Sequence, residues 1–403
     1  MIAPRFEVLP PLAVYVHLPW CVRKCPYCDF NSHEARGEVP QDAYVDALLA
    51  DLELSLPAVW GRKVHAAFIG GGTPSLFTPA AIDRLLAGLR ARLPFQPGAE
   101  VTMEANPGTF ERERFAGFRA AGVNRLSLGV QSFDDAKLAA LGRIHSADEA
   151  RRAAEAAMQI FGNVNLDLMF ALPGQTLREC ERDVDAALAL GTPHVSFYQL
   201  TLEPNTLFHA QPPAGLPDAD AAADMQELVA AGLRRAGLHR YEVSAYARTG
   251  AQCAHNLNYW RFGDYLGLGA GAHGKVSLAD RIVREARWKH PRDYVQKVAA
   301  GQPATERREV TREEIGFEFM LNALRLTEGV PAALFAERTG FPLAVVARPL
   351  AEGAQRGLIV DDPSRLAATE LGQRFLNTTL ELFLPRAAAV TAAVPVALDR
   401  VAR

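Results

Sequence analysis

The sequence predicts an α/β protein, in which a partial barrel of six βα units precedes a small C-terminal α+β domain. Strand-like apolar runs alternate with helix-like runs up to about residue 240, and successive βα units place parallel strands side by side through right-handed crossovers. Polar residues recur at every second position in three of these strands, whereas strands buried on both faces are almost uniformly apolar. A lined cavity follows, which favours a partial barrel over an open doubly wound sheet; six units are too few for the eight-fold barrel.

Each predicted strand is followed by a predicted helix. The strands are expected at Leu12–Leu18, Ala66–Gly70, Glu100–Asn106, Arg125–Ser132, Val164–Leu172 and His194–Leu202. The helices are expected around residues 40–55, 79–92, 111–121, 147–160, 176–190 and 218–236. Cys180 falls within the fifth helix, where we expect it to be an ordinary packed residue.

The polar positions of the strands should line the inside of the barrel, because alternate residues of a strand point to the same face. The sets are Thr102, Glu104 and Asn106; Ser127 and Gln131; and Asn163, Asn165 and Asp167. Three unrelated buried hydrogen-bond sites are the alternative explanation. Several of these residues lie at the C-terminal ends of their strands, and a cysteine loop and a glycine triplet follow two other strands at the same end. A barrel carries its catalytic and binding residues at this rim.

Three cysteines lie on the loop that follows the first strand. Cys21, Cys25 and Cys28 have the spacing C-x-x-x-C-x-x-C, and the next four residues contain no further cysteine or histidine. Iron–sulfur cubanes usually bind four thiolates, so three thiolates leave one iron without a protein ligand. A zinc site would need further ligands, for which His33 is the nearest candidate. A disulfide with a spare thiol is the other alternative, and the spacing favours an iron–sulfur cluster.

The composition is that of an ordinary soluble protein with room for two domains. The chain has 403 residues, 49% apolar and 22% charged, and a formal net charge of −3, which gives no basic field for nucleic acid. No apolar run approaches the length that spans a bilayer, and the first residues do not resemble a secretory signal. Five cysteines, three of them clustered, fit a reducing compartment. We therefore expect a cytoplasmic protein.

The motifs together resemble the radical S-adenosylmethionine (SAM) superfamily, in its branch similar to the oxygen-independent coproporphyrinogen III oxidase. The matching strings are Tyr15–Cys21, Gly70–Ser75, Glu104–Pro107, Gly129–Phe133 and Leu141–His145, in the order of that branch over residues 12–385. The resemblance implies a [4Fe–4S] cluster on the three cysteines, with SAM bound to its open iron. It also implies a SAM site formed by Tyr15, Gly71, Gly72, Thr73, Glu104, Gln131, Arg143 and Asp167. Some members of the branch hold a second SAM.

Further features resemble the HemW-type haem chaperones within this branch. The dehydrogenase continues its loop with a fourth cysteine and has a longer N-terminal arm, whereas this chain has Phe30 and reaches Tyr15 almost at once. The string His255–Trp260 resembles the H-N-x-x-Y-W signature of the chaperones, which bind haem for delivery to respiratory haem proteins. The resemblance makes His255 the candidate haem ligand, with Cys253 a second candidate; the residues alone also allow His255 to hold the following Gly267–Gly271 turn by hydrogen bonds. That glycine-rich stretch resembles the segment that closes over the SAM pocket in relatives.

The chain is expected to divide into four parts. Residues 1–245 form the radical SAM partial barrel, 246–306 a connecting segment, 307–385 a winged-helix-like domain and 386–403 a loose tail. In the third part we expect helices at Glu313–Arg325, from Ala332, at Leu343–Arg356 and at Gly372–Phe383, with a hairpin over 357–369. Its mixed charges do not fit nucleic-acid binding, so covering the barrel mouth or contacting a client protein is its expected role.

The expected function is a haem chaperone that carries haem to apo haem proteins of the respiratory chain. The alternative is an oxygen-independent coproporphyrinogen III dehydrogenase, which uses SAM for oxidative decarboxylation. A radical methyltransferase or haem-opening enzyme of the same branch is a third hypothesis. No catalytic residue is assigned, and transient docking at the cytoplasmic membrane and a homodimer stay open.

Overall fold

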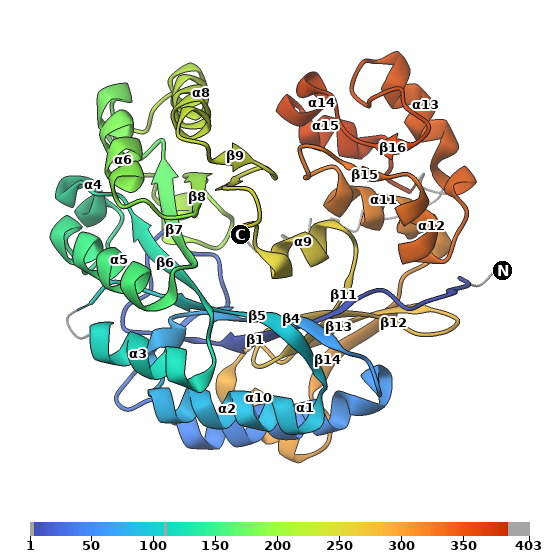
Figure 1. Cartoon of the computed structure of the whole chain (residues 1–403), viewed down its shortest axis with the longest axis horizontal. Helices are drawn as coiled ribbons and strands as arrows, with labels where there is room; N and C mark the ends of the chain where they lie inside the picture. The colour runs from blue at the N-terminus through green and yellow to red at the C-terminus, as the bar shows by residue number, and fades with distance from the viewer. Residues whose placement is uncertain (1–3, 109–110, 386–403) are drawn as a thin grey trace.

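A single twelve-stranded sheet forms the centre of the computed structural model, which describes residues 4–108 and 111–385. The strand order is β14-β13-β12-β11-β1-β4-β5-β6-β7-β8-β10-β9. The sheet is strongly curved, with most of the long helices on its outer face and one short helix on its concave side (Figure 1). No helix in these two ranges is long and apolar enough to cross a membrane.

The six predicted strands are the parallel centre of this sheet, which confirms the partial barrel of βα units. Four of them begin at the predicted residue, whereas β4 and β5 begin earlier. The six strands are β1 (Leu12–Leu18), β4 (Val64–Gly71), β5 (Phe95–Ala105), β6 (Arg125–Gln131), β7 (Val164–Phe170) and β8 (His194–Gln199).

Six outer helices follow these strands, also as predicted. Local signals set their ends: Ser146 and Thr176 each start a helix with a reciprocal capping box, and Gly162 ends one in the left-handed conformation. Cys180 is fully buried in the fifth of these helices, as expected. The helices are α1 (Gln41–Val59), α2 (Pro79–Arg92), α3 (Glu111–Ala121), α5 (Ala147–Phe161), α6 (Leu177–Ala189) and α8 (Ala219–Arg235), with short α4 (Asp135–Ala140) and α7 (Leu207–Ala210) at the rim.

Residues 246–306, expected to be a connecting segment, extend the sheet. The strand β11 (Asp264–Leu268) pairs in parallel with β1, and three antiparallel strands continue from it. At the other edge, β8 pairs with the short antiparallel strand β10, which in turn pairs with β9. The added elements are β9 (His239–Arg240), β10 (Ala245–Ala247), α9 (Ala254–Trp260), β12 (His273–Ser277), β13 (Ile282–Arg287), α10 (Pro291–Ala299) and β14 (Ala304–Glu309).

The C-terminal part holds the predicted helices and hairpin. Ile359 bridges Ala368 across the hairpin, and the two short strands β15 and β16 pair beside it. The last predicted helix is divided in two, and β14 crosses the expected boundary at residue 307. The elements are α11 (Arg312–Ala323), β15 (Val330–Pro331), α12 (Ala333–Thr339), η2 (Leu343–Val346), α13 (Ala347–Gln355), β16 (Arg365–Leu366), α14 (Glu370–Arg374) and α15 (Leu376–Glu381). The expected tail, 386–403, lies outside the described residues.

Candidate functional site

The cysteine loop is closed at its base by a pair of two-residue strands. Cys21 ends β2 (Trp20–Cys21), which pairs with β3 (His33–Glu34) after the loop. Inside the loop, the N–H of Cys28 donates to the carbonyl of Cys25 at 3.1 Å. All three cysteines are half-buried and free of disulfides. The pairing holds the loop that carries Cys21, Cys25 and Cys28 at the rim, where β1 ends.

Each thiol has at least one hydrogen-bonding neighbour. The hydroxyl of Thr73 donates to Cys21 Sγ at 3.5 Å, and Arg143 donates to Cys25 Sγ at 3.6 Å. Cys28 Sγ lies 3.7 Å from the hydroxyl of Ser32. Burial raises the pKa of Cys21 and Cys28, so without a metal these thiols stay protonated at neutral pH. Soft sulfur ligands with nearby donors suit iron–sulfur chemistry.

The thiols do not gather around one point. Within residues 4–108 and 111–385, no three His, Cys, Asp or Glu side chains converge closely enough to hold a single metal ion. A cubane has a different requirement, because each cysteine binds a separate iron. The fit of the loop to a cluster therefore depends on its donor chemistry and spacing.

A hydrogen-bonded arc joins Cys25 to Cys21 behind the loop. Arg143, which contacts Cys25, also donates to Asn106 Oδ1 at 2.7 Å and to the carbonyl of Gly129 at 2.8 Å. Asn106 Nδ2 in turn donates to Thr73 Oγ1 at 3.0 Å, and Thr73 contacts Cys21. A Cβ at residue 129 would lie 2.6 Å from Asn106 Oδ1, so a glycine is required there. Asn106, a polar strand-end residue outside the predicted SAM set, thus holds two members of that set.

The glycine triplet allows protein groups to approach one another closely. A Cβ at Gly71, whose φ is +118°, would lie 2.6 Å from the ring of His17, and one at Gly72 would lie 2.5 Å from the carbonyl oxygen of Trp20. A side chain at Gly70 would meet the carboxylate of Glu104 at 2.9 Å. The triplet therefore fits β4 against the chain that leads into the cysteine loop, whether or not a ligand also approaches it.

Two carboxylates, Glu104 and Asp167, face the lumen and form hydrogen bonds to uncharged groups. Asp167 accepts hydrogen bonds from Ser127 at 2.8 Å and Asn165 at 2.9 Å, while Glu104 accepts one from the Gly71 N–H at 3.0 Å. Neither carboxylate forms a salt bridge with any residue that the structure describes. Burial and the neighbouring Asp167 raise the pKa of Glu104 to about 8, and burial raises the pKa of Asp167. The pair suits a cationic ligand with N–H and O–H donors.

Tyr15 and Gln131 complete the predicted SAM set on the inner face. The hydroxyl of Tyr15 lies 2.9 Å from His17 Nδ1, and Tyr15 is half-buried in an otherwise buried strand. Gln131 ends β6 at a bulge with φ 71°, an unusual conformation for a residue with a side chain. All eight predicted SAM residues thus belong to the rim or inner face of one half-barrel.

His255 lies in the same lumen as this set. It belongs to α9, the short helix on the concave side of the sheet (Figure 1). Its ring centroid lies 5.1 Å from Phe68, 5.0 Å from Tyr259 and 6.3 Å from Tyr15. Only 3% of His255 is exposed, its Nδ1 has no hydrogen-bond partner among the described residues, and burial lowers its pKa to about 3. The imidazole is therefore neutral, as metal ligation requires.

Glu100 of β5 anchors the start of α9. Its Oε1 accepts hydrogen bonds from the N–H groups of Ala254 at 3.0 Å and His255 at 3.3 Å. The thiol of Cys253 donates to the same oxygen at 3.4 Å, and burial raises the pKa of that thiol to about 12. Cys253, the second candidate haem ligand, is thus a buried neutral thiol at the beginning of the helix.

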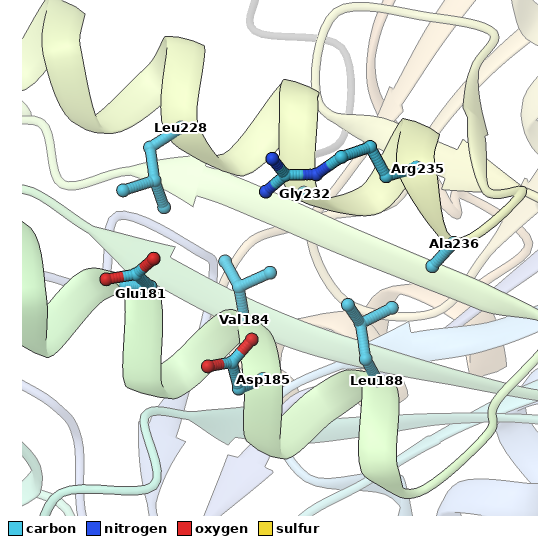
Figure 2. A pocket seen from close by; sticks show the side chains of 8 residues that line it. All are labelled: Glu181, Val184, Asp185, Leu188, Leu228, Gly232, Arg235 and Ala236. Carbon is cyan, nitrogen blue, oxygen red and sulfur yellow. The ribbon is translucent and has the colours of Figure 1, made fainter.

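Two of the cavities among the described residues lie outside the lumen. One of ≈290 Å³ lies between α6 and α8, lined by Glu181 and Asp185 on one helix and Arg235 on the other (Figure 2). It contains no residue that the sequence marked. The other, of ≈480 Å³, flanks the cysteine loop and is lined by Arg23, Lys24, Cys25, Cys28 and Leu207, among others.

Comparisons with known proteins identify the family and the fold. Residues 15–187 match the model of the radical SAM superfamily, and residues 310–375 match the HemN C-terminal domain. In structure, the chain is similar to coproporphyrinogen III oxidase (HemN) of Escherichia coli, with a TM-score of 0.79 and 24% identity over 93% of this chain and 90% of that one. The barrel and its cysteine loop are those of a radical SAM protein.

Sequence relatives define the family more narrowly. The heme chaperone HemW of Escherichia coli K12 is 51% identical over 93% of this chain and 99% of its own length. That of Bacillus subtilis is 36% identical over 92% and 99%. The mitochondrial radical S-adenosyl methionine domain-containing protein 1 of Bos taurus is 37% identical over 93% and 87%. The chain belongs to the HemW family, as the sequence motifs predicted.

Proposed function

We propose that this protein is a haem chaperone that holds a [4Fe–4S] cluster, SAM and haem as its cargo. One observation carries the proposal: the chain aligns at 51% identity with 99% of a relative named heme chaperone. The gathering of the cysteine loop, the carboxylate pair and His255 around one lumen supports it. In the same proposal, the protein delivers haem to apo haem proteins of the respiratory chain, either in the cytoplasm or at the cytoplasmic membrane.

In this proposal Cys21, Cys25 and Cys28 bind the cluster, whose fourth iron would bind SAM. Glu104 accepts hydrogen bonds from the amino group of SAM, and Asp167 accepts them from its ribose. Arg143 is already committed to Cys25, Asn106 and Gly129. Arg143 therefore holds the cysteine loop in place, and a hydrogen bond to the SAM carboxylate would be made besides these contacts.

His255 is the proposed haem ligand, and its burial sets a condition on binding. A neutral imidazole among aromatic rings suits a porphyrin iron. A ring that is only 3% exposed cannot contact a porphyrin until its aromatic neighbours or α9 shift. Haem binding in this proposal is consequently coupled to a rearrangement around α9.

Haem titration of the anaerobically reconstituted protein tests the proposal. Wild type and a His209→Ala control, which removes an exposed histidine from α7, should bind haem with the same affinity and absorption spectrum. His255→Ala should bind more weakly and with a changed spectrum. An unaltered spectrum in His255→Ala would remove this histidine from the site, and no binding by wild type would refute the chaperone function.

An assay with coproporphyrinogen III separates the chaperone from the dehydrogenase. The structural similarity to the oxidase is a similarity of fold at 24% identity. Phe30, which stands where the resemblance places a fourth cysteine, is 38% exposed beside the cysteine loop. We expect no decarboxylated product from the reduced protein with SAM, and product formed at enzymatic turnover would overturn the chaperone assignment.

A further inference from the structure

The exit of the cysteine loop is fastened to a distant part of the chain. Asn31 follows Cys28 by three residues, and both N–H groups of its side-chain amide have acceptors. Nδ2 donates to the carbonyl of Ala270 at 2.9 Å and to the carbonyl of Lys289 at 2.8 Å. The backbone carbonyl of Asn31 lies 2.9 Å from His17 Nε2, the ring beneath Gly71. One residue therefore contacts β1, the cysteine loop and the segment after β11.

The glycine-rich stretch 267–271 is shaped to receive this residue. Gly271 has φ +77°, and a Cβ there would lie 2.3 Å from Asn31 Nδ2. Gly269 has φ +104°, and a Cβ there would lie 2.3 Å from the carbonyl oxygen of His17. Both glycines are required by a positive φ and by the close approach of protein groups. The stretch packs directly against β1 and the loop exit.

The receiving stretch is itself rigidly held. Tyr44 OH accepts from the Ala270 N–H at 2.7 Å and donates to the carbonyl of His17 at 3.0 Å. Tyr294 OH accepts from the Gly269 N–H at 3.2 Å and donates to Asp51 at 2.8 Å. Asp51 also forms a fully buried salt bridge with Arg287, and such buried networks tolerate little displacement. Asn31 is thus tied to a support rooted in α1 and α10.

We propose that Asn31 is a positioning residue for the iron–sulfur cluster, which fixes the cysteine loop against the 267–271 stretch so that its three thiols keep the spacing that the cluster needs. The inference rests on the proposed cluster. In this inference the glycine-rich stretch supports the cysteine loop, and the side chain of Asn31 makes the contact between them.

Asn31→Asp is the sharpest test, because it keeps the shape of the side chain and removes both N–H donors. In the reconstituted full-length protein we expect release of iron to a chelator to accelerate by roughly thirtyfold, the effect of losing both hydrogen bonds of the side-chain amide. The electron paramagnetic resonance spectrum of the reduced cluster should also change. Asn31→Ala, which adds no charge, should behave alike, and Asn377→Asp on exposed α15 should match wild type.

A double variant tests the contact itself. Gly271→Ala drives a methyl group into Asn31, so it should also accelerate iron release. In Asn31→Ala/Gly271→Ala the two closest collisions, with Nδ2 at 2.3 Å and Cγ at 2.6 Å, are removed, and only the contact with the Asn31 Cβ at 2.9 Å stays. The combined effect should therefore fall below the product of the two single effects. Fully multiplicative effects, or wild-type release and spectra in both Asn31 variants, would overturn the proposal. A wild type that holds no cluster would instead refute the cluster assignment.

Discussion

The polar side chains at the rim are hydrogen-bonded to one another and to the cysteines, so none of them is an independent ligand. Arg143 bonds to Cys25 and Asn106, and Thr73 bonds to Asn106 and Cys21. A donor beside a thiolate stabilises its charge, and hydrogen bonds to the sulfurs of a cluster help to set its potential. The hydrogen bonds through Asn106 therefore affect both the position of Cys21 and Cys25 and the reduction potential of a cluster bound to them.

Replacement of a loop cysteine should remove the cluster. We expect Cys25→Ala to lose the iron and sulfide of the anaerobically reconstituted protein, because two thiolates cannot hold a cubane firmly. Cys180→Ala is the matched control, since this buried thiol lies in α6 and belongs to the hydrophobic core. Full iron and sulfide content in Cys25→Ala would contradict the assignment.

The lumen carboxylate Glu104 should make stability depend on pH. Its pKa is raised to about 8, so between pH 4.5 and 8 the folded protein keeps a proton that the unfolded chain releases. The free energy of unfolding therefore falls as pH rises through this window. Glu104→Gln lacks this proton, so its stability relative to wild type should increase from pH 5 to pH 8.5. Urea denaturation of both proteins without cluster measures it, and a pH-independent difference would exclude the raised pKa.

At the scale of elements, α9 depends on β5 for its start. The helix has only seven residues, and Cys253 before it provides no side-chain cap. The carboxylate of Glu100 replaces the missing cap by accepting two backbone N–H groups. The helix α9, which contains the His255–Trp260 string, is therefore held in the lumen by a side chain of β5.

Loss of this carboxylate should loosen α9. We expect Glu100→Ala to accelerate amide hydrogen exchange at residues 254–258, while Glu100→Gln, which keeps an acceptor oxygen, should exchange nearly as slowly as wild type. Exchange in α10 should stay the same in both variants. Equal protection of α9 in Glu100→Ala and wild type would show that packing alone holds the helix.

The elements with regular patterns were predictable from the sequence, and those at the sheet edges were not. The long apolar strands and capped helices of the barrel carry their period and end signals locally, as at Ser146 and Gly162. The strands β12 and β13 are short and largely buried, yet they carry charged residues such as Lys275 and Arg284. They join the sheet through β11, whose pairing with β1 brings together segments far apart in the chain, and no local pattern reveals that contact.

The site was predictable in its residue types more than in its contacts. The cysteine spacing and the polar period in β5 to β7 indicated a lined cavity, and the structure joins several of those polar residues by hydrogen bonds. The approach of His255 to Tyr15, 240 positions earlier in the chain, was not foreseeable. Neither was its burial, because that follows from how α9 packs into the barrel.

At the scale of the whole molecule, the C-terminal domain connects both sides of the open sheet. Phe319 of α11 packs against Phe262 after α9, with ring centroids 5.6 Å apart. Arg325 lies 4.3 Å from the centroid of the Trp260 ring and forms a salt bridge with Glu242, near β9, at 3.3 Å. The C-terminal domain therefore contacts both α9 and the β9 edge of the sheet and holds them together.

Removal of this bridge should destabilise the fold. Arg325→Ala leaves the carboxylate of Glu242 almost fully buried without its cation, so we expect a loss of about 2 kcal/mol in the free energy of unfolding. Arg374→Ala breaks an exposed pair with Glu227 and should cost no more than about 0.5 kcal/mol. Chemical denaturation of both variants measures the difference, and equal losses would contradict the bridging role.

The pairing of β1 with β11 sets an order for biosynthesis. Leu12 lies beside Asp264, so the first strand to leave the ribosome waits for most of the chain before it gains its second neighbour. Until then one edge of β1 is open, and open strand edges invite pairing with other chains. The nascent half-barrel, with its reduced cysteines already emerged, is accordingly the stage of the protein's life at which shielding by a folding helper matters most.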